Sequence, residues 1–477
     1  MNLLLNFISL IGIVILCFIA WLGSENRLII PWKVIFWGIG LQLFIGLLIF
    51  VLPTRDLIAQ INNLLNAVLD ASEAGARFLF GGSDSAIVPD PNRIVGPGPA
   101  ARWIVRTVGT PYVEIPGDRL TPDNLNLGFI FAFRSLPQII FFSGLISLLY
   151  RLNIIQPIVE LFAKIFQKTM NISGAESLSG AANIFVGIES AIAVKPYLKD
   201  MTRSELCTIL SCCFGSIASS ILGIFAAILR PTFPDITGHL VSASIMTIPA
   251  CVVLSKLLIP ETEKPKTLGH VPSEKKKEND QLPNPMDSLM NGGIDGVKMA
   301  VGIVAILIVI LGLLALVNAI FNGLANLPSP LGNIFQIITV QNILGAIFLP
   351  LTFLTGVSLE WNELWQVSIL IGRRLFETSI PPYFTLAQLK AAGEISDRGL
   401  LIVSYVLCGF TNMASYGIFV GGISNLIPSR RSELSALGWK ALWVGTLATL
   451  MTGCVAGLFD FGNPTILGLI SCSDNQL

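Results

Sequence analysis

Two glutamates, Glu189 and Glu377, stand inside hydrophobic segments of this 477-residue sequence. A carboxylate within a membrane is costly, so such a residue is first considered as part of a functional site. Paired carboxylates can accept hydrogen bonds from the vicinal hydroxyl groups of a sugar. The alternative is a structural ion pair, for example with Arg373 or Arg374.

Oxygen-bearing groups lie near the first of these glutamates. Asn183 and Val186 precede Glu189, and Ser216 and Ile217 lie in a later run of small residues that could unwind. An amide oxygen, a hydroxyl and freed backbone carbonyls would form a hard-oxygen site that suits a small cation. The alternative is ordinary helix packing through small residues, which is common in membranes.

Four further side chains have both a functional and a structural interpretation. Phe410 and Tyr416 could stack on a planar ring, although lone aromatics in a span are more often core residues. Glu176 is interpreted as a helix-terminus or interface group, and Arg134 as a structural partner of a buried group.

Composition places these residues in a membrane. The chain is 53% hydrophobic and 13% charged, whereas soluble domains carry roughly twice that charge fraction. Its 30 basic and 30 acidic residues cancel, which excludes a charge-driven nucleic-acid binder. There is no CxxC pair, and His239 and His270 are too few for histidine-based metal or acid–base chemistry.

The elements that must position the candidate residues are membrane helices. About eight segments meet the length of about 20 apolar residues that a span requires. They are 3–22, 29–53, 127–150, 205–229, 238–260, 296–323, 399–427 and 437–460. No basic residue precedes the first segment, so it is expected to be a span rather than a cleaved signal peptide.

Two other hydrophobic segments carry charges or prolines that lipid would not tolerate. Residues 173–198 contain Glu176 and Glu189, and residues 363–390 contain Pro381 and Pro382 beside two arginines. Each is predicted to be a re-entrant hairpin buried in protein.

The hairpins and the spans after them form an internal repeat. The pattern F-x-[SN]-[IM]-A-S begins at Phe214 and again at Phe410, each time after a hairpin that holds a glutamate. Lysines and arginines concentrate on one set of short connections, which predicts that both termini are outside. The first hairpin then faces the cytoplasm and the second faces outside. An inverted repeat of this kind is typical of secondary transporters.

The predicted architecture is an all-α integral membrane protein with the following parts. Residues 1–126 hold two spans, an amphipathic helix at 54–79 and an external loop; 127–260 hold the third span, the first hairpin and the first repeat; 261–293 form a cytoplasmic linker, charged and disordered up to 286; 294–460 hold the sixth span, the second hairpin and the second repeat; and 461–477 form the tail.

Several long runs resemble the concentrative nucleoside transporter family, and the resemblance covers nearly everything from about 127 to 460. The runs are SGAESLSGAANIFVG at 173–187, FAFRSLPQIIFFSGLISLLYRLNI at 131–154, KPYLKDMTRSELCTIL at 195–210 and CGFTNMASYGIFVGGISNLIPSRRSEL at 408–434.

The resemblance implies a homotrimer in the plasma membrane that imports a nucleoside by symport with sodium, or with protons in some members. It also implies interfacial helices at about 155–170 inside and 333–357 outside. The sodium ligands it implies are Asn183, the Val186 carbonyl, Ser216 and the Ile217 carbonyl. The substrate contacts it implies are Glu189, Ile221, Phe410, Asn412, Ser415 and Tyr416. Retention of Asn183 and Ser216 favours sodium over protons.

The chain departs from the family pattern at both hairpin tips. The family usually has Gly-Gln-Thr-Glu-Ala-Pro at the first tip, whereas residues 187–191 read Gly-Ile-Glu-Ser-Ala, with one residue fewer before Lys195. Glu189 keeps the carboxylate, but the base-reading glutamine is lost. The second tip usually has Asn-Glu-Phe, whereas residues 376–379 read Phe-Glu-Thr-Ser. Glu377 is the candidate for the second sugar-binding carboxylate.

Three functions remain open from the sequence. The first is sodium–nucleoside symport. The second keeps the transporter fold with proton coupling or with another solute, such as a nucleobase or a polyol-bearing compound. The third is a non-transporting membrane assembly protein with a gate-like repeat. An enzyme is not expected, because no nucleophile–base pair, metal cluster or phosphate loop appears.

Overall fold

The computed structural model describes residues 2–50, 55–80, 131–187, 190–269, 271, 284–326 and 339–462. Glu189, most of the predicted loop at 80–126, most of the linker and the tail beyond 462 lie outside these residues, as does the side chain of Arg134. The described residues form helices, with one isolated β-bridge between Ser173 and Leu268, so the all-α prediction is confirmed.

Six helices in the described part of the chain are long and apolar enough to cross a membrane. They are α1 (Asn2–Leu22), α2 (Trp32–Phe50), α5 (Phe131–Arg151), α12 (Ile236–Leu258), α13 (Pro285–Ala325) and α20 (Arg431–Leu458, preceded by a 3₁₀ turn at Pro428–Arg430). Each covers one of the predicted spans. A further helix, α3 (Arg55–Phe80), forms where the sequence predicts an amphipathic helix.

The remaining two predicted spans are each broken into two helices. The first consists of α10 (Arg203–Gly215) and α11 (Ser219–Leu229), and the second of α18 (Asp397–Leu407) and α19 (Met413–Leu426). We call residues 216–218 the first break and 408–412 the second break.

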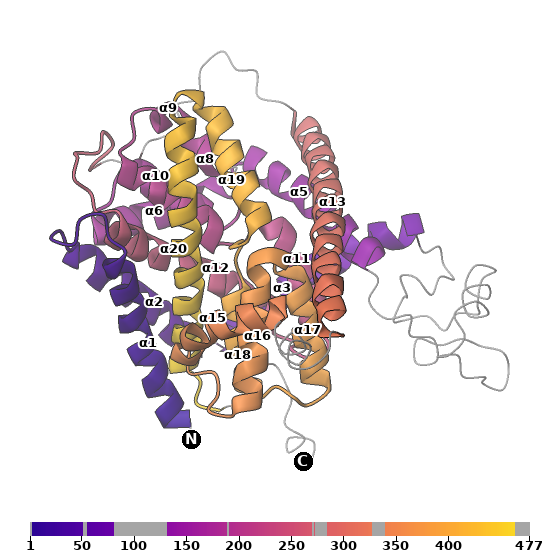
Figure 1. Cartoon of the computed structure of the whole chain (residues 1–477). Coiled ribbons are helices and arrows are strands. Elements are labelled where there is room, and N and C mark those ends of the chain that lie inside the picture. Colours follow the sequence, from indigo (N-terminus) through magenta and orange to yellow (C-terminus); the bar gives the residue numbers. More distant parts are fainter. Residues whose placement is uncertain are drawn as a thin grey trace. The chain divides into compact units, whose positions relative to one another are not determined.

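The two halves of the chain repeat one order of elements: a single helix, a hairpin, a broken helix and a long helix. The first half runs α6 (Gln156–Met170), α7 (Gly174–Ala182), α8 (Ser190–Ala193), α9 (Lys195–Leu198), α10, α11 and α12. The second half runs α15 (Val340–Leu354), α16 (Trp361–Glu377), α17 (Ile380–Ala391), α18, α19 and α20. Figure 1 shows these elements coloured along the chain.

The chain separates into two compact units. One contains Met1–Ala59, Asn153–Gln281 and Val304–Leu477, and therefore both repeats; the other contains Gln60–Leu152 and Leu282–Ile303. In the second unit, α5 and the beginning of α13 meet through small residues. A Cβ added at Gly292 would lie 2.7 Å from the carbonyl oxygen of Ser143, so only glycine permits this approach.

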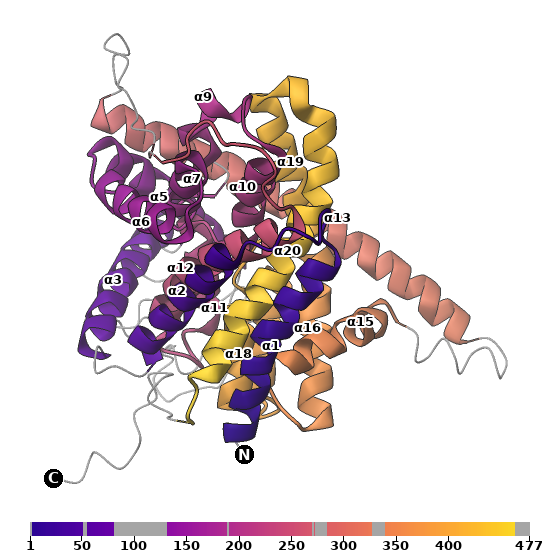
Figure 2. The same cartoon turned by 90° about the vertical axis from the view of Figure 1, so that its left-hand side faces the viewer.

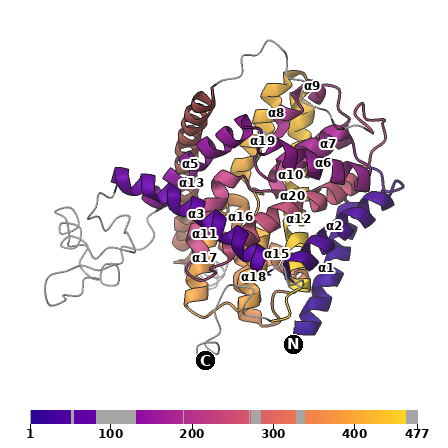
Figure 3. The ribbon, with the colours of Figure 1, turned by 180° about the vertical axis from the view of Figure 1, so that it is seen from behind.

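The first unit is built around α12 and α20, which are its most deeply buried long helices. The α10 helix packs against both of them, α1 lies along α20 and α2 lies along α12 (Figures 2 and 3). Hydroxyls of Thr247 and Thr452 join the two long helices at 3.0 Å. The broken helices are thus held against a rigid centre.

Reciprocal caps fix where the helices of the first half begin. Ser173 accepts a bond from the Glu176 amide while the Glu176 carboxylate accepts one from the Ser173 amide, and Thr202 and Glu205 repeat this capping box at α10. The interpretation of Glu176 as a helix-terminus group is therefore confirmed. Thr267 accepts bonds from the Gly174 and Ala175 amides through its carbonyl and its hydroxyl.

A buried ion pair fastens the end of each long helix. Lys256 near the end of α12 lies 2.6 Å from Glu176 and 3.2 Å from Glu261. Asp460, just after α20, lies 3.2 Å from Arg398 at the start of α18. The basic residue of the pair thus lies on the long helix in the first half and on the broken helix in the second half.

Candidate functional site

The first break places non-helical backbone deep in the protein. Ser216 has φ −90° and ψ 169°, and Ala218 has φ −68° and ψ 139°, both of which are extended rather than helical. Ser216 is buried, and its hydroxyl donates to the Cys212 carbonyl at 2.8 Å. Ile217 is also buried. Unwound backbone of this type exposes carbonyl groups that can coordinate a cation.

The side-chain oxygen of Asn183 has no partner among the residues that the structure describes. Its side chain is 0% exposed, and its Nδ2 donates to the Ser179 carbonyl at 3.2 Å and to Cys213 Sγ at 3.7 Å. Its Oδ1 has no hydrogen-bond partner among the described residues. Because Cys213 lies three residues before Ser216, this contact ties Asn183 to the helix that carries the first break. A buried acceptor left empty is costly and calls for a ligand or water.

The residues predicted for sodium therefore fit a hard cation in type and burial. Asn183, Ser216 and Ile217 are buried, and Val186 is half-buried beside the hairpin turn. All would offer neutral oxygens, which suit sodium rather than a transition metal.

The second break contacts the last turn of α10, directly before the first break. The Phe410 amide donates to the Phe214 carbonyl at 2.8 Å, and a Cβ added at Gly409 would lie 2.8 Å from the Gly215 carbonyl oxygen. Asn412 caps α19, because its Oδ1 accepts from the Ser415 amide at 2.9 Å. Thr411 is buried, and its hydroxyl has no partner among the described residues. The second break is thus held against the end of α10, next to the first break.

The predicted substrate residues divide into three groups. Phe410, Asn412 and Ser415 are gathered at the second break. Ile221 is buried on α11. Tyr416 turns toward α20: its hydroxyl donates to the Ser435 carbonyl at 2.8 Å and its ring lies 4.8 Å from that of Trp439.

Glu377, the last residue of α16, forms the ion pair that the sequence left as the alternative. Arg373 on the same helix lies 2.8 Å from its carboxylate and also donates to Thr385 at 3.3 Å. The next residue, Thr378, has φ +69° and ψ 179°, a positive-φ conformation that is strained for a β-branched side chain. Ser379 then donates to the Gly409 carbonyl at 3.0 Å, which holds the second hairpin against the second break.

Sequence reasoning missed the roles of Cys213, Thr411 and Ser379. Cysteine, threonine and serine are common in membrane helices, so only their burial and contacts distinguish them. Arg374 was considered as a partner for a glutamate, but its Nη1 donates instead to the Val406 carbonyl and to the Thr449 hydroxyl.

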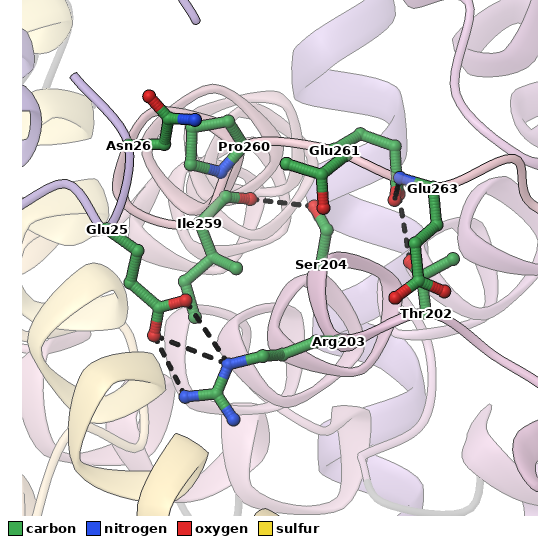
Figure 4. A pocket seen from close by; sticks show the side chains of 10 residues that line it. Glu25, Asn26, Thr202, Arg203, Ser204, Ile259, Pro260, Glu261 and Glu263 are labelled. Carbon is green, nitrogen blue, oxygen red and sulfur yellow. Dashed lines mark hydrogen bonds and ion pairs between the residues drawn. The ribbon is translucent and has the colours of Figure 1, made fainter. Parts of the chain in front are cut away.

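One surface cavity of about 230 Å³ lies at the opposite end of α10 and is not the candidate site. Its lining includes the Glu25–Arg203 ion pair, at 2.8 Å, and Thr202, which donates to Glu261 at 2.9 Å (Figure 4). It adjoins the first turn of α10, whose 13 residues put the break about 20 Å away. Hydrogen bonds from Arg203 and then Lys440 lower the pKa of Glu25.

Two successive repeats, each with a hairpin and a broken helix, are an arrangement typical of secondary transporters of the membrane. The family model described as Na+ dependent nucleoside transporter C-terminus matches residues 239–457, and its N-terminal counterpart matches 11–83. A third model, Gate: Nucleoside recognition, matches 132–232.

Known proteins can be aligned with nearly the whole chain. An uncharacterized transporter of Haemophilus influenzae is 33% identical, with 94% of this chain and 97% of that protein aligned. Solute carrier family 28 member 3 of Mus musculus is 32% identical over 95% of this chain but only 59% of its own length. The structure of CNTnw in an inward-facing substrate-bound state matches with a TM-score of 0.80 at 31% identity, covering 95% of this chain and 98% of that one.

The chain belongs to the concentrative nucleoside transporter family. It is accordingly a multi-pass membrane transporter and not an enzyme.

Proposed function

We propose that this protein imports nucleosides across the plasma membrane by symport with sodium. The observation that carries the proposal is the Oδ1 atom of Asn183, which is fully buried, has no partner among the described residues, and belongs to a side chain that contacts the helix of the first break. A sodium ion held there by Asn183, the Val186 carbonyl, Ser216 and the Ile217 carbonyl would satisfy this oxygen.

The substrate is proposed to lie next to the cation, at the crossing of the two breaks. Glu189 in the first hairpin and Asn412 and Ser415 in the second half would bind the sugar hydroxyls, while Ile221 and Phe410 would contact the base. Sodium would stabilise the first break and thereby the binding surface for the nucleoside, so each ligand should tighten binding of the other.

Glu377 and Tyr416 are proposed as substrate contacts that require a rearrangement. Glu377 would exchange Arg373 for a sugar hydroxyl, and Tyr416 would leave the Ser435 carbonyl. Both side chains already have protein partners. This favours a second candidate function, in which neither residue binds a nucleoside and the transporter carries another polyol-bearing solute. The working form is proposed to be a homotrimer in the lipid bilayer.

Uptake by proteoliposomes tests the proposal. Radiolabelled nucleosides are offered under an imposed sodium gradient, an imposed proton gradient, or neither. Sodium-driven accumulation of a nucleoside is expected. Accumulation that follows the proton gradient in the absence of sodium would contradict sodium coupling, and uptake of a nucleobase or a sugar alone would contradict the nucleoside assignment.

A further inference from the structure

The linker after α12 begins as an extended segment that packs on the protein. We call residues 261–268 the strap. Pro265 and Thr267 in the strap are buried, whereas the residues on either side of Thr267 are exposed. This alternation is typical of an extended chain with one face against the protein. Leu268 forms the isolated β-bridge with Ser173, so the strap lies beside the start of the first hairpin.

The far end of the strap caps the first helix of that hairpin. The first amides of a helix have no partner within the helix itself. The Gly174 amide donates to the Thr267 carbonyl at 2.9 Å, and the Ala175 amide donates to the Thr267 hydroxyl at 3.1 Å. The next amide, that of Glu176, is satisfied by Ser173 within the hairpin. Two amides at the start of α7 therefore depend on a residue of the linker.

The near end of the strap reaches the same helix through an ion pair. Glu261 lies 3.2 Å from Lys256 and accepts a hydrogen bond from the Thr202 hydroxyl at 2.9 Å. Lys256 is buried and also lies 2.6 Å from Glu176, in the first turn of α7. Removing one partner from a buried pair is strongly destabilising. The two ends of the strap thus hold the first turn of α7, one directly and one through a lysine.

The α7 helix joins this held turn to Asn183. Nine helical residues span about 14 Å, and Asn183 follows directly as the C-cap. All nine residues are buried. Since protein interiors are close-packed and transmit strain, a tilt at the base of such a short helix displaces its far end. The displaced end would be the one that contacts Cys213, three residues before the first break.

From these contacts we infer that the strap positions Asn183 through α7. Thr267 is a positioning residue, because it acts on the far end of the hairpin through the helix that it caps. The linker therefore contributes to the candidate site besides joining the two halves of the chain. This mechanical role does not depend on the proposed function, whereas its effect on the sodium requirement rests on it.

Hydrogen exchange, measured by mass spectrometry on the full chain in detergent, tests the inference. Thr267→Val removes the hydroxyl and keeps the shape of the side chain. Because a buried amide then lacks an acceptor, α7 should exchange about 5- to 150-fold faster. We expect the increase to extend to residues 183–187. Thr267→Ser keeps the hydroxyl and should match the wild type, as should the control Thr262→Val, because Thr262 is exposed on the same strap.

The extent of the faster exchange decides between positioning and local capping. An increase confined to the first turn of α7 would overturn the inference, as would an equal increase in the Thr262→Val control. Glu261→Gln weakens the other end of the strap and should speed exchange at 183–187 by a smaller factor. If Thr267→Val does not yield folded protein, Glu261→Gln decides the matter, and unchanged exchange at 183–187 in that variant would overturn the inference.

The sodium requirement is a readout that a stabilising role alone would not move. Thr267→Val should raise the sodium concentration needed for half-maximal uptake, by less than Asn183→Ala does, and Thr267→Ser should restore it. Faster exchange at 183–187 with an unchanged sodium requirement would support the positioning role of the strap and contradict the sodium site proposed at Asn183. Uptake by the wild type that ignores sodium would likewise contradict only the proposed coupling.

Discussion

The amide of Phe410 donates to the carbonyl of Phe214 at 2.8 Å, so a backbone hydrogen bond joins the second break to the end of α10, two residues before the first break. Glycines make this contact possible. A Cβ at Gly409 would lie 2.8 Å from the Gly215 oxygen and 2.7 Å from Cγ2 of Thr449, and a Cβ at Gly215 would lie 2.3 Å from Cys251 Sγ.

Gly409→Ala should therefore separate the breaks. Overpacking of this kind costs roughly 1–3 kcal/mol, and we expect both a lower melting temperature and weaker substrate binding. The matched control is Gly417→Ala on α19, where an added Cβ meets nothing within 4 Å. Gly417→Ala should leave stability unchanged or raise it, because alanine favours a helix. Equal behaviour of the two variants would show that the crossing tolerates a methyl group.

Removing either of the two side-chain ligands predicted for sodium, Asn183 or Ser216, should raise the sodium concentration needed for half-maximal uptake. Loss of one ligand oxygen from a charged partner costs roughly 1.5–3 kcal/mol, so Asn183→Ala or Ser216→Ala should raise that concentration about 10- to 150-fold. The control for Ser216 is Ser368→Ala, because Ser368 is also buried and donates to a carbonyl of its own helix, that of Leu364. An unchanged sodium requirement in both ligand variants would contradict the cation site.

Glu189→Gln should nearly abolish substrate binding while leaving a folded protein. The variant loses a charge-assisted hydrogen bond to the sugar, worth roughly 1.5–3 kcal/mol or about 10- to 150-fold in affinity. Calorimetry with the preferred nucleoside measures the change, and size-exclusion chromatography checks the assembly. Unchanged affinity would remove Glu189 from the site.

Selectivity for the base should be weak compared with selectivity for the sugar. Ile188 stands where the family has a glutamine, and an apolar side chain has no polar group to leave unpaired when the wrong base binds. Removal of ribose hydroxyls should therefore weaken binding more than replacing uracil with adenine. Competition between uridine, adenosine and their deoxy analogues measures this. A sharp preference for one base, with deoxy forms tolerated, would assign base recognition to other residues.

Acid should remove the contribution of Glu25 to stability. Its pKa is lowered by Arg203 and Lys440, so its stabilising effect is present above the unfolded-state pKa of about 4.3 and is lost as the pH falls through the lower folded-state value. The pair is partly exposed, and about 0–1 kcal/mol is expected. Glu25→Gln should lower the melting temperature slightly at pH 7, and the difference from wild type should shrink below about pH 4. A difference that grows in acid would contradict this assignment.

Much of the architecture follows from hydrophobic length and from the charges that interrupt it. The segment 363–390 is predicted as a buried hairpin because Arg373, Arg374 and Glu377 cannot face lipid, and α16 and α17 form that hairpin. The breaks are harder to predict. The run after Phe214 is apolar enough to continue as a helix, and it is interrupted where Gly215 meets α12 and the second break. The small residues around Ser216 indicate that the backbone could unwind there, but the contact that accompanies the break joins residues far apart in sequence and is not visible in local composition.

Partners within the site are the least predictable feature. From the sequence, Arg373 and Arg374 are equally plausible ion-pair partners of Glu377. Helical geometry brings Arg373, four residues away, onto the same face as Glu377, whereas Arg374 turns to α18 and α20. The environment of Asn183 is likewise set by folding, because its side chain is buried and contacts Cys213, which lies 30 residues later in the chain.

The two ion pairs that fasten the long helices bear on the ancestry of the molecule. A repeat of this kind is what duplication of one ancestral segment would produce, and its two copies would at first have been interchangeable. Lys256 with Glu176 in one copy and Arg398 with Asp460 in the other place the base on different elements. If α12 were exchanged with α20 and the Asp460 that follows it, Glu176 would lose its basic partner and Arg398 would lose its acidic partner. The copies have therefore diverged past the point at which one can replace the other, and each half now evolves under constraints of its own.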